Sequence, residues 1–340
     1  MPIKKILLLG ATGQIGKELS LLLSKNKNID LVCHARKKVS AAFLSNLKIN
    51  CIICDFQNNE LKNQIQNSDL IFDLVAPSTG NLDETKKFYK DRLNYLIKNM
   101  RPKTKFIFAS SMNAFGLSSK NNKLKNYILP SSIYAANKRF AENIVEKESK
   151  KKNIEFYIVR LPDVHGEIQR VTQFIKTLIS NEYIFEIPKS PAWIVFINTI
   201  QEMIINIINN KEKSGRYTLV NDEIYWSDLL EYFGRKINKK AKYKILSHKN
   251  ESYYLKIKKY IYKLILSKRD IIRGNLSISK EFETHKKIQY RVAKAKNAYR
   301  LLEGQKIYNG LNLYKGILPG KRFKNLTQQK NIIFQRNDDM

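Results

Sequence analysis

The sequence is short of cysteine, of acidic residues and of long apolar runs. Its three cysteines, Cys33, Cys51 and Cys54, form an odd set near the N-terminus, which argues against a disulfide framework. The spacing of Cys51 and Cys54 would suit a metal knuckle, but no second pair of ligands accompanies them, so we expect no metal site. No run approaches the roughly 18 apolar residues that a membrane-spanning helix needs. We therefore expect a cytoplasmic protein, with peripheral membrane contact left open.

The shortage of acidic residues gives the chain a large positive charge. It has 62 Lys and Arg against 30 Asp and Glu, a net charge of +32. From Arg235 to the end there are 28 basic and seven acidic residues, so most of the excess lies in the C-terminal third. Such a field attracts nucleotides, phosphorylated lipids or nucleic acid. A composition rich in Lys, Ile and Asn throughout the chain is an equally weighted explanation.

Short apolar strands alternate with helical patterns through the first half of the chain. The expected strands are Ile3–Leu9, Asp30–His34, Ile49–Cys54, Leu70–Val75, Lys105–Ala109 and Glu155–Arg160. The expected helices are Gly16–Lys25, Val39–Leu47, Glu60–Ile65, Thr85–Asn99 and Ser132–Lys150. Continuous apolar strands that alternate with helices are typical of an α/β protein with a Rossmann-type, doubly wound parallel sheet.

The pattern changes after Gly166, and we divide the chain accordingly. Residues 1–166 are the predicted dinucleotide-binding domain, and residues 167–245 are a smaller α/β substrate-binding lobe. Residues 246–340 are a basic C-terminal extension of uncertain fold. Within it, Tyr253–Ile272 suits a helix packed on the lobe, or a basic amphipathic helix on an anionic membrane.

A glycine-rich turn joins the first strand to the first helix. Gly10, Gly13 and Gly16 have the spacing that lets a backbone turn tightly and approach a pyrophosphate. The N–H groups and the positive dipole of the following helix then favour the bound anion. The turn is completed by Thr12, Gln14 and Ile15. This context predicts a nicotinamide-dinucleotide site.

The end of the second strand bears on which dinucleotide is bound. An acidic residue there holds a ribose 2′-hydroxyl, whereas an arginine suits a 2′-phosphate. The sequence has Arg36, Lys37 and Lys38 and no acid, which favours NADP over NAD, with Arg36 as the phosphate partner. Asp55 and Phe56, after the third strand, are placed to contact the adenine ring.

A second motif, Tyr134-Ala-Ala-Asn-Lys138, suits proton transfer. Residues four apart lie on one helix face. A tyrosine with an ordinary pKa of about 10 is a poor base at neutral pH, but a nearby lysine ammonium favours the phenolate. Upstream, an apolar strand ends in Ser110 and Ser111, where a hydroxyl can hydrogen-bond the substrate oxygen.

Taken together, these pieces resemble the extended short-chain dehydrogenase/reductase family of NAD(P)-dependent sugar-nucleotide epimerases, dehydratases and reductases. The resemblance covers about residues 3–236. The matching segments are Gly10–Gly16, Asp55-Phe56, Ser110–Gly116, Tyr134–Lys138, Ala141-Glu142 and Arg160–Gly166.

The resemblance implies a role for each matching residue. Ser111 is then the catalytic hydroxyl, Tyr134 the general acid/base, and Lys138 the residue that holds the nicotinamide ribose. Pro162 and Val164 border the nicotinamide end, and Ala76 borders the middle of the cofactor. The family also implies a homodimer formed through the helix that carries Tyr134. His165 stands where the family commonly has tyrosine, and we expect it to be a pocket-wall residue.

Some positions depart from the family. Its dehydratases carry an Asp-Glu pair just after the catalytic hydroxyl, and Met112 and Asn113 stand there instead, which disfavours dehydration. We therefore expect an epimerase or ketoreductase that acts on a nucleotide-activated sugar or a related glycan precursor. The alternative is a non-catalytic relative that senses a dinucleotide and binds nucleic acid or a protein through its basic C-terminal third. The intact set of Ser111, Tyr134 and Lys138 argues against this alternative. Nucleic acid is the less favoured of the two partners.

Overall fold

The computed structural model describes residues 3–77, 82–115, 133–188, 192, 194–221 and 224–246. The strands are β1 (Lys4–Leu9), β2 (Ile29–Ala35), β3 (Cys51–Ile53), β4 (Leu70–Asp73), β5 (Lys105–Ser111), β6 (Glu155–Leu161), β7 (Asp163–His165), β8 (Ile184–Pro188), β9 (Ile194–Phe196), β10 (Gly215–Thr218) and β11 (Lys242–Leu246). The helices are α1 (Gln14–Ser24), α2 (Lys38–Asn46), α3 (Asn59–Asn67), α4 (Leu82–Asn99), a 3-10 turn η1 (Met112–Phe115), α5 (Ile133–Lys152), α6 (Arg170–Ser180), α7 (Ile197–Ile208) and α8 (Trp226–Lys236). The predicted helix at Tyr253–Ile272 and almost all of the predicted extension lie outside the described residues.

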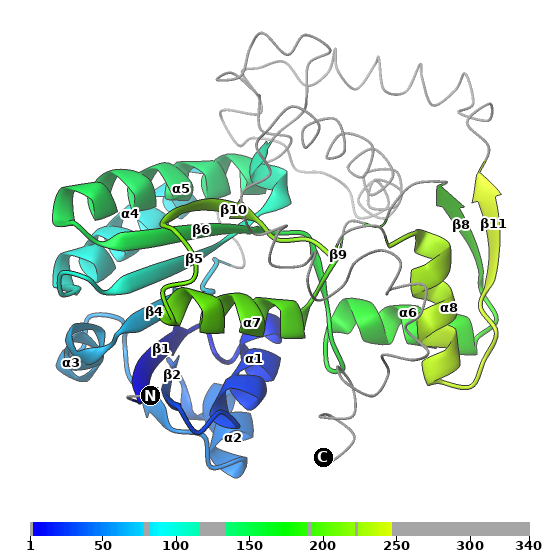
Figure 1. The fold of residues 1–340 in the computed structure, drawn as a ribbon, viewed down its shortest axis with the longest axis horizontal. Coiled ribbons are helices and arrows are strands. Elements are labelled where there is room, and N and C mark those ends of the chain that lie inside the picture. Colours follow the sequence, from blue (N-terminus) through cyan, green and yellow to red (C-terminus); the bar gives the residue numbers. More distant parts are fainter. Residues whose placement is uncertain are drawn as a thin grey trace, which may run out of the picture.

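Seven parallel strands form the main sheet, in the order β10-β6-β5-β4-β1-β2-β3. The chain moves outward from β1 to β2 and β3, then returns to β4 on the other side of β1 (Figure 1). This reversal creates a topological switch point at the carboxyl ends of β1 and β4, where doubly wound sheets bind their ligands. The predicted α/β class and parallel, doubly wound sheet are confirmed.

Helices cover both faces of the sheet. One apolar core includes α1 and α7, and the other includes α3, α4 and α5 (Figure 1). On α7, Ile200, Ile204 and Ile207 recur every three or four residues and are fully buried. Burying each such side chain contributes on the order of 1.5–3 kcal/mol. The packing of α7 thus makes it part of the dinucleotide-binding layer.

Two elements in the range assigned to the lobe therefore belong to the sheet domain. Besides α7, β10 extends the main sheet by pairing with β6 from Gly215↔Tyr157 to Thr218↔Arg160. What remains of the lobe is α6, α8 and the parallel pair β8–β11, with their own apolar core. The short pair β7–β9 joins lobe and sheet domain.

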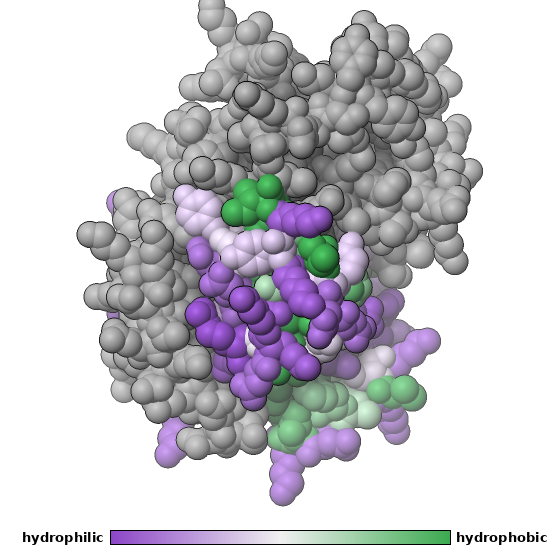
Figure 2. Space-filling model, turned by 90° about the vertical axis from the view of Figure 1, so that its right-hand side faces the viewer, coloured by the Kyte–Doolittle hydropathy of each residue, from purple (hydrophilic) through white to green (hydrophobic). Residues whose placement is uncertain are grey.

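The outer end of the lobe is polar and basic. Hydrophilic side chains cover much of its described surface (Figure 2). A groove of about 920 Å³ lies where α8 leads into β11, and its lining includes Arg235, Lys239, Lys240, Lys242 and Lys244. The basic character of the C-terminal third thus begins within the folded lobe. In the part of the chain that the structure describes, no helix is long and apolar enough to cross a membrane.

Candidate cofactor and catalytic site

The glycine turn lies at the switch point and has no room for a side chain at Gly16. Gly10 has φ +80°, a conformation that favours glycine, and its carbonyl accepts a hydrogen bond from the Gly13 N–H at 3.0 Å. A Cβ on Gly16 would lie 2.2 Å from the Gly10 carbonyl oxygen. The turn therefore packs backbone against backbone, and α1 begins at Gln14 with its first N–H groups available to an anion.

The other turn residues differ in exposure. Gly13 and Gln14 are exposed, and Thr12 and Ile15 are half-buried, with Ile15 packed on the core. Among described residues, the first turn of α1 carries no acidic side chain that would repel a phosphate. This geometry fits the pyrophosphate of a dinucleotide.

The basic residues after β2 surround the start of α2. Arg36, Lys37 and Lys38 are all exposed, and the first turn of α2 holds no acidic residue. Beside them, His34 is buried and its Nε2 lies 3.0 Å from the carbonyl oxygen of Cys54. Burial lowers the pKa of His34, which disfavours a positive charge on its ring.

Phe56 lies against a buried ion pair that we did not predict. Arg92 of α4 binds Asp73, the last residue of β4, through two hydrogen bonds of 2.5 Å. The Arg92 guanidinium also lies 5.0 Å from the centre of the Phe56 ring. Phe56 is half-buried in this cluster, whereas Asp55 is exposed at the end of β3. The sequence signal for the pair was a lone acid that ends the apolar strand β4.

The predicted catalytic residues come from β5 and α5. Ser111 is the last residue of β5 and is buried, and its Oγ accepts a hydrogen bond from the Asn113 N–H at 3.2 Å. Tyr134 lies at the start of α5 and is 46% exposed. Lys138, one turn further, is 3% exposed and donates a hydrogen bond of 2.7 Å to the carbonyl oxygen of Ala109. The lysine thus links α5 to the end of β5, two residues before Ser111.

Aromatic rings surround the Lys138 ammonium. Its Nζ lies 5.0 Å from the ring centre of Phe108, 5.5 Å from that of Tyr89 and 5.9 Å from that of Tyr134. Burial lowers the pKa of Lys138 to about 8, although the carboxylate of Asp73 opposes this shift. At neutral pH the lysine is therefore mainly protonated and places a positive charge beside Tyr134.

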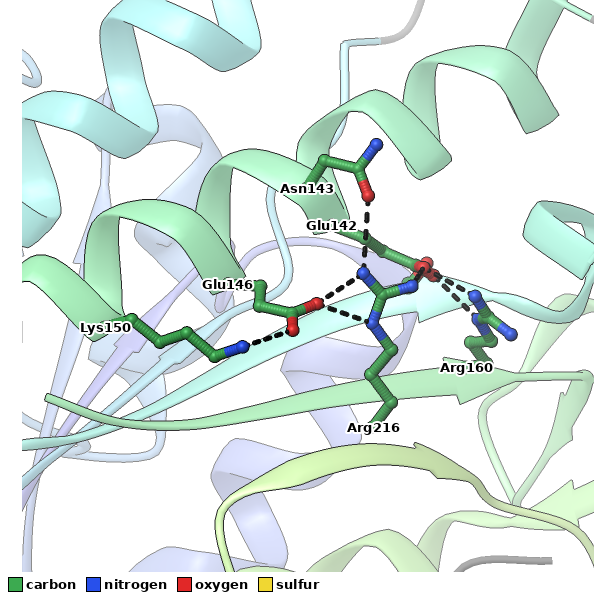
Figure 3. A network of polar contacts seen from close by, with 7 residues as sticks. Glu142, Asn143, Glu146, Lys150, Arg160 and Arg216 are labelled. Carbon is green, nitrogen blue, oxygen red and sulfur yellow. Dashed lines mark hydrogen bonds and ion pairs between the residues drawn. The ribbon is translucent and has the colours of Figure 1, made fainter. Parts of the chain in front are cut away.

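A network of charged side chains centred on the buried Glu142 joins α5 to neighbouring strands (Figure 3). Glu142 of α5 is fully buried and accepts hydrogen bonds from Ser110 Oγ at 2.5 Å and from Arg160 at 2.9 and 2.7 Å. Arg216 of β10 reaches the same carboxylate at 3.4 Å and binds Glu146 at 2.6 Å. Four elements, β5, α5, β6 and β10, are thereby tied together next to Ser111.

The remaining predicted residues have different surroundings. Pro162 and Val164 are buried on either side of the start of β7, and Ala76 is exposed just after β4. His165 is buried, with its Nδ1 3.0 Å from Thr172 Oγ1 and its ring beside Phe233. It therefore packs within the lobe core.

The fold and site define a dinucleotide-binding α/β protein of the short-chain dehydrogenase/reductase type. The features that do so are the doubly wound parallel sheet, the glycine turn at its switch point and the buried lysine of the Tyr-x-x-x-Lys motif. Comparison with protein families makes this assignment specific. The model of the NAD dependent epimerase/dehydratase family matches residues 6–183. The chain belongs to this family, as its motifs predicted.

Individual relatives are distant. The chain is 24% identical over 286 residues to the bifunctional polymyxin resistance protein ArnA of Wigglesworthia glossinidia brevipalpis, and the match covers 78% of this chain. It covers only 42% of that curated relative.

Solved structures share the fold at low identity. UDP-glucuronic acid 4-epimerase from Bacillus cereus in complex with NAD is 21% identical with a TM-score of 0.56, covering 71% of this chain and 87% of that chain. Helicobacter pylori ADP-L-glycero-D-manno-heptose-6-epimerase is 18% identical with a TM-score of 0.56, and the match covers 72% of this chain and 86% of that chain. These likenesses establish the fold.

Proposed function

We propose that the chain is an NAD(P)-dependent epimerase or ketoreductase that acts on a nucleotide-activated sugar or a related glycan precursor. The observation that carries this proposal is the position of Lys138. It is buried beside the Tyr134 ring and bonded to β5 just before Ser111. The glycine turn lies at the switch point of the same sheet. Burying a lysine ammonium costs free energy, which favours a functional role for Lys138 over a purely structural one.

The named relatives support the substrate class. Structures that match this fold include complexes with NAD and with UDP-glucuronic acid or UDP-glucose. The family described by the matching profile is itself NAD dependent. We infer by this likeness that a nucleotide sugar binds between the sheet domain and the lobe.

Each catalytic residue then has a defined task. When bound, a nicotinamide dinucleotide would accept hydride from, or donate it to, the carbon that bears the substrate hydroxyl. Tyr134 transfers the proton of the substrate hydroxyl, and Ser111 hydrogen-bonds the same oxygen. Lys138 holds the nicotinamide ribose and favours the Tyr134 phenolate through its charge. Pro162, Val164 and Ala76 border the bound dinucleotide.

The exposed basic residues after β2 support NADP as the cofactor. Arg36 is the proposed partner of the 2′-phosphate, and the absence of an acidic residue in the first turn of α2 removes a source of repulsion. NADP would suit a reductase, which consumes NADPH. The Ser-x-x-x-Phe motif that begins at Ser111 suits an epimerase instead, which returns the hydride to its substrate. NAD or NADP that co-purifies with the full chain would identify the cofactor by mass spectrometry.

Replacing Tyr134 with phenylalanine tests the proposal. The Tyr134→Phe variant keeps the ring but loses the transferable proton, so we expect turnover of nucleotide sugars to fall by about 100-fold or more. Dinucleotide affinity should stay within about twofold. Tyr183→Phe, which alters an exposed tyrosine of the lobe, is the matched control. Unchanged turnover in Tyr134→Phe would refute the enzymatic assignment.

A further inference from the structure

Hydrogen bonds that no catalytic step uses fasten the start of the lobe to the cofactor helix. Glu18 lies on α1 just after the glycine turn and is 6% exposed. Its carboxylate accepts hydrogen bonds from the Glu167 N–H at 2.6 Å and from Gln169 Nε2 at 2.7 Å. A buried carboxylate with these two donors ties α1 to the segment that precedes α6.

Gln14 completes this contact from within the glycine turn. Its carbonyl oxygen accepts a hydrogen bond from Gln169 Nε2 at 3.0 Å, and its side-chain Oε1 accepts one from the Arg170 N–H at 3.0 Å. Gln14 is the first residue of α1 and Arg170 the first of α6. We name Gln14, Glu18, Glu167, Gln169 and Arg170 the α1–α6 clasp.

The chain passes so close to Glu18 at Gly166 that a larger residue there would displace the Glu18 carboxylate. A Cβ on Gly166 would lie 2.4 Å from both carboxylate oxygens of Glu18. Five residues earlier, Leu161 is paired with Ser111 in the main sheet. Residues 162–165 are thus held at one end by the sheet and at the other by the clasp.

We propose that Glu18 and Gln169 are positioning residues that couple dinucleotide binding to the order of the lobe. This inference rests on the proposed function, which places Pro162 and Val164 at the nicotinamide end. A pyrophosphate bound by the N–H groups of the turn restrains Gln14, and Gln14 restrains α6 through the clasp. Because coupling between sites is reciprocal, a lobe ordered by substrate also favours the dinucleotide-binding form of the turn.

Hydrogen–deuterium exchange of the full chain, with and without saturating NADH or NADPH, tests this coupling. In the wild-type protein, we expect the dinucleotide to slow exchange both in residues 10–17 and in residues 167–180, by about fivefold or more. In Glu18→Ala, residues 10–17 should still be protected, whereas the protection of 167–180 should be lost. Gln169→Ala removes a neutral side chain instead of a carboxylate and should also abolish the protection of 167–180. Ser24→Ala, at an exposed position of α1, should behave as wild type.

The possible results separate the two proposals. Protection of residues 10–17 without any change at 167–180 in the wild-type protein would overturn the coupling alone. Undiminished protection of 167–180 in both Glu18→Ala and Gln169→Ala would overturn it as well. If neither NADH nor NADPH protects residues 10–17 in the wild-type protein, the proposed function fails, and the coupling fails with it.

Discussion

Lys138 meets two opposing demands at the residue scale. Desolvation among the rings of Phe108, Tyr89 and Tyr134 disfavours its charge, whereas the proposed chemistry needs that charge beside Tyr134. The nearby carboxylates of Asp73 and Glu142 limit this downward shift of its pKa. With a pKa of about 8, the lysine remains mainly charged near neutral pH.

Lys138 should also make folding stability depend on pH. Its pKa falls from an ordinary 10.5 to about 8 in the folded chain because of burial. Below about pH 8 the lysine is protonated in both the folded and the unfolded chain, so its buried charge has its full destabilising effect on the folded state. Between about pH 8 and 10.5 the unfolded chain keeps a proton that the folded chain has released. In that window this group should raise the free energy of unfolding by up to about 1.4 kcal/mol per pH unit.

Chemical unfolding across this pH range provides the measurement. The free energy of unfolding of the wild-type protein, minus that of Lys138→Met, should increase from about pH 8 to pH 10. Other titrating groups are common to both proteins and cancel in the difference. Lys150→Met, which removes an exposed lysine of the same helix, should give a much flatter difference. A pH-independent difference for Lys138→Met would contradict the expectation.

At the scale of elements, α5 serves two purposes on successive turns. Tyr134 and Lys138 belong to the proposed catalytic site, and one turn later Glu142 binds the charged groups of β5, β6 and β10. The same helix therefore carries the proposed catalytic groups and anchors the strand that ends in Ser111. A displacement of α5 would alter both at once.

The two glutamates of this network should differ in their contribution to stability. Glu142→Gln leaves the buried Arg160 without its carboxylate, so we expect a loss of about 3–5 kcal/mol in the free energy of unfolding. Glu146→Gln removes a partly exposed partner of the same Arg216 and should cost about 1 kcal/mol or less. Denaturant unfolding of both variants measures the two free energies of unfolding. Equal losses would show that burial of the carboxylate does not determine its contribution to stability.

Elements with a strong local pattern could be predicted from the sequence. The strands and helices of the sheet domain follow from their apolar periodicity, and the glycine turn follows from its spacing. The pairs β7–β9 and β8–β11 could not, because strands of three to five residues carry little periodic signal. The place of α7 also escaped prediction, since an apolar helix face does not specify which surface it covers.

The candidate site shows the same division. Lys138 and Ser111 belong to local motifs, whereas the pairing of Asp73 with Arg92 depends on how β4 and α4 pack. By sequence, Glu18 is one polar residue of an amphipathic helix. Its burial results from a segment about 150 residues further along the chain, which no local pattern could indicate.

On the scale of the whole molecule, a fold built for a small anionic cofactor carries a large excess of positive charge. Part of that excess lies in the described lobe, where Arg235, Lys239, Lys240, Lys242 and Lys244 line one groove. The net charge of +32 belongs to the chain as a whole. At low salt a field of this size acts over tens of ångströms and promotes contact with anionic surfaces.

We therefore propose peripheral contact with anionic membranes, which co-sedimentation can measure. The full chain should bind vesicles that contain phosphatidylserine more tightly than vesicles of phosphatidylcholine alone. Binding should weaken as salt rises from about 10 mM to 150 mM, because the Debye length falls from about 30 Å to about 8 Å. Equal binding to both kinds of vesicle would contradict this proposal. Tighter binding to an RNA oligonucleotide at the same salt would favour a nucleic-acid partner instead.

The late position of α7 and β10 in the chain has a consequence for biosynthesis. When residue 166 leaves the ribosome, β6 is an open edge and the apolar surface that α7 will cover still faces water. At 5–20 residues per second, roughly a few seconds then pass before residue 208 also leaves the ribosome. During that interval the nascent sheet domain is exposed to aggregation and to chaperones. Its folding can be completed only after part of the lobe has already been translated.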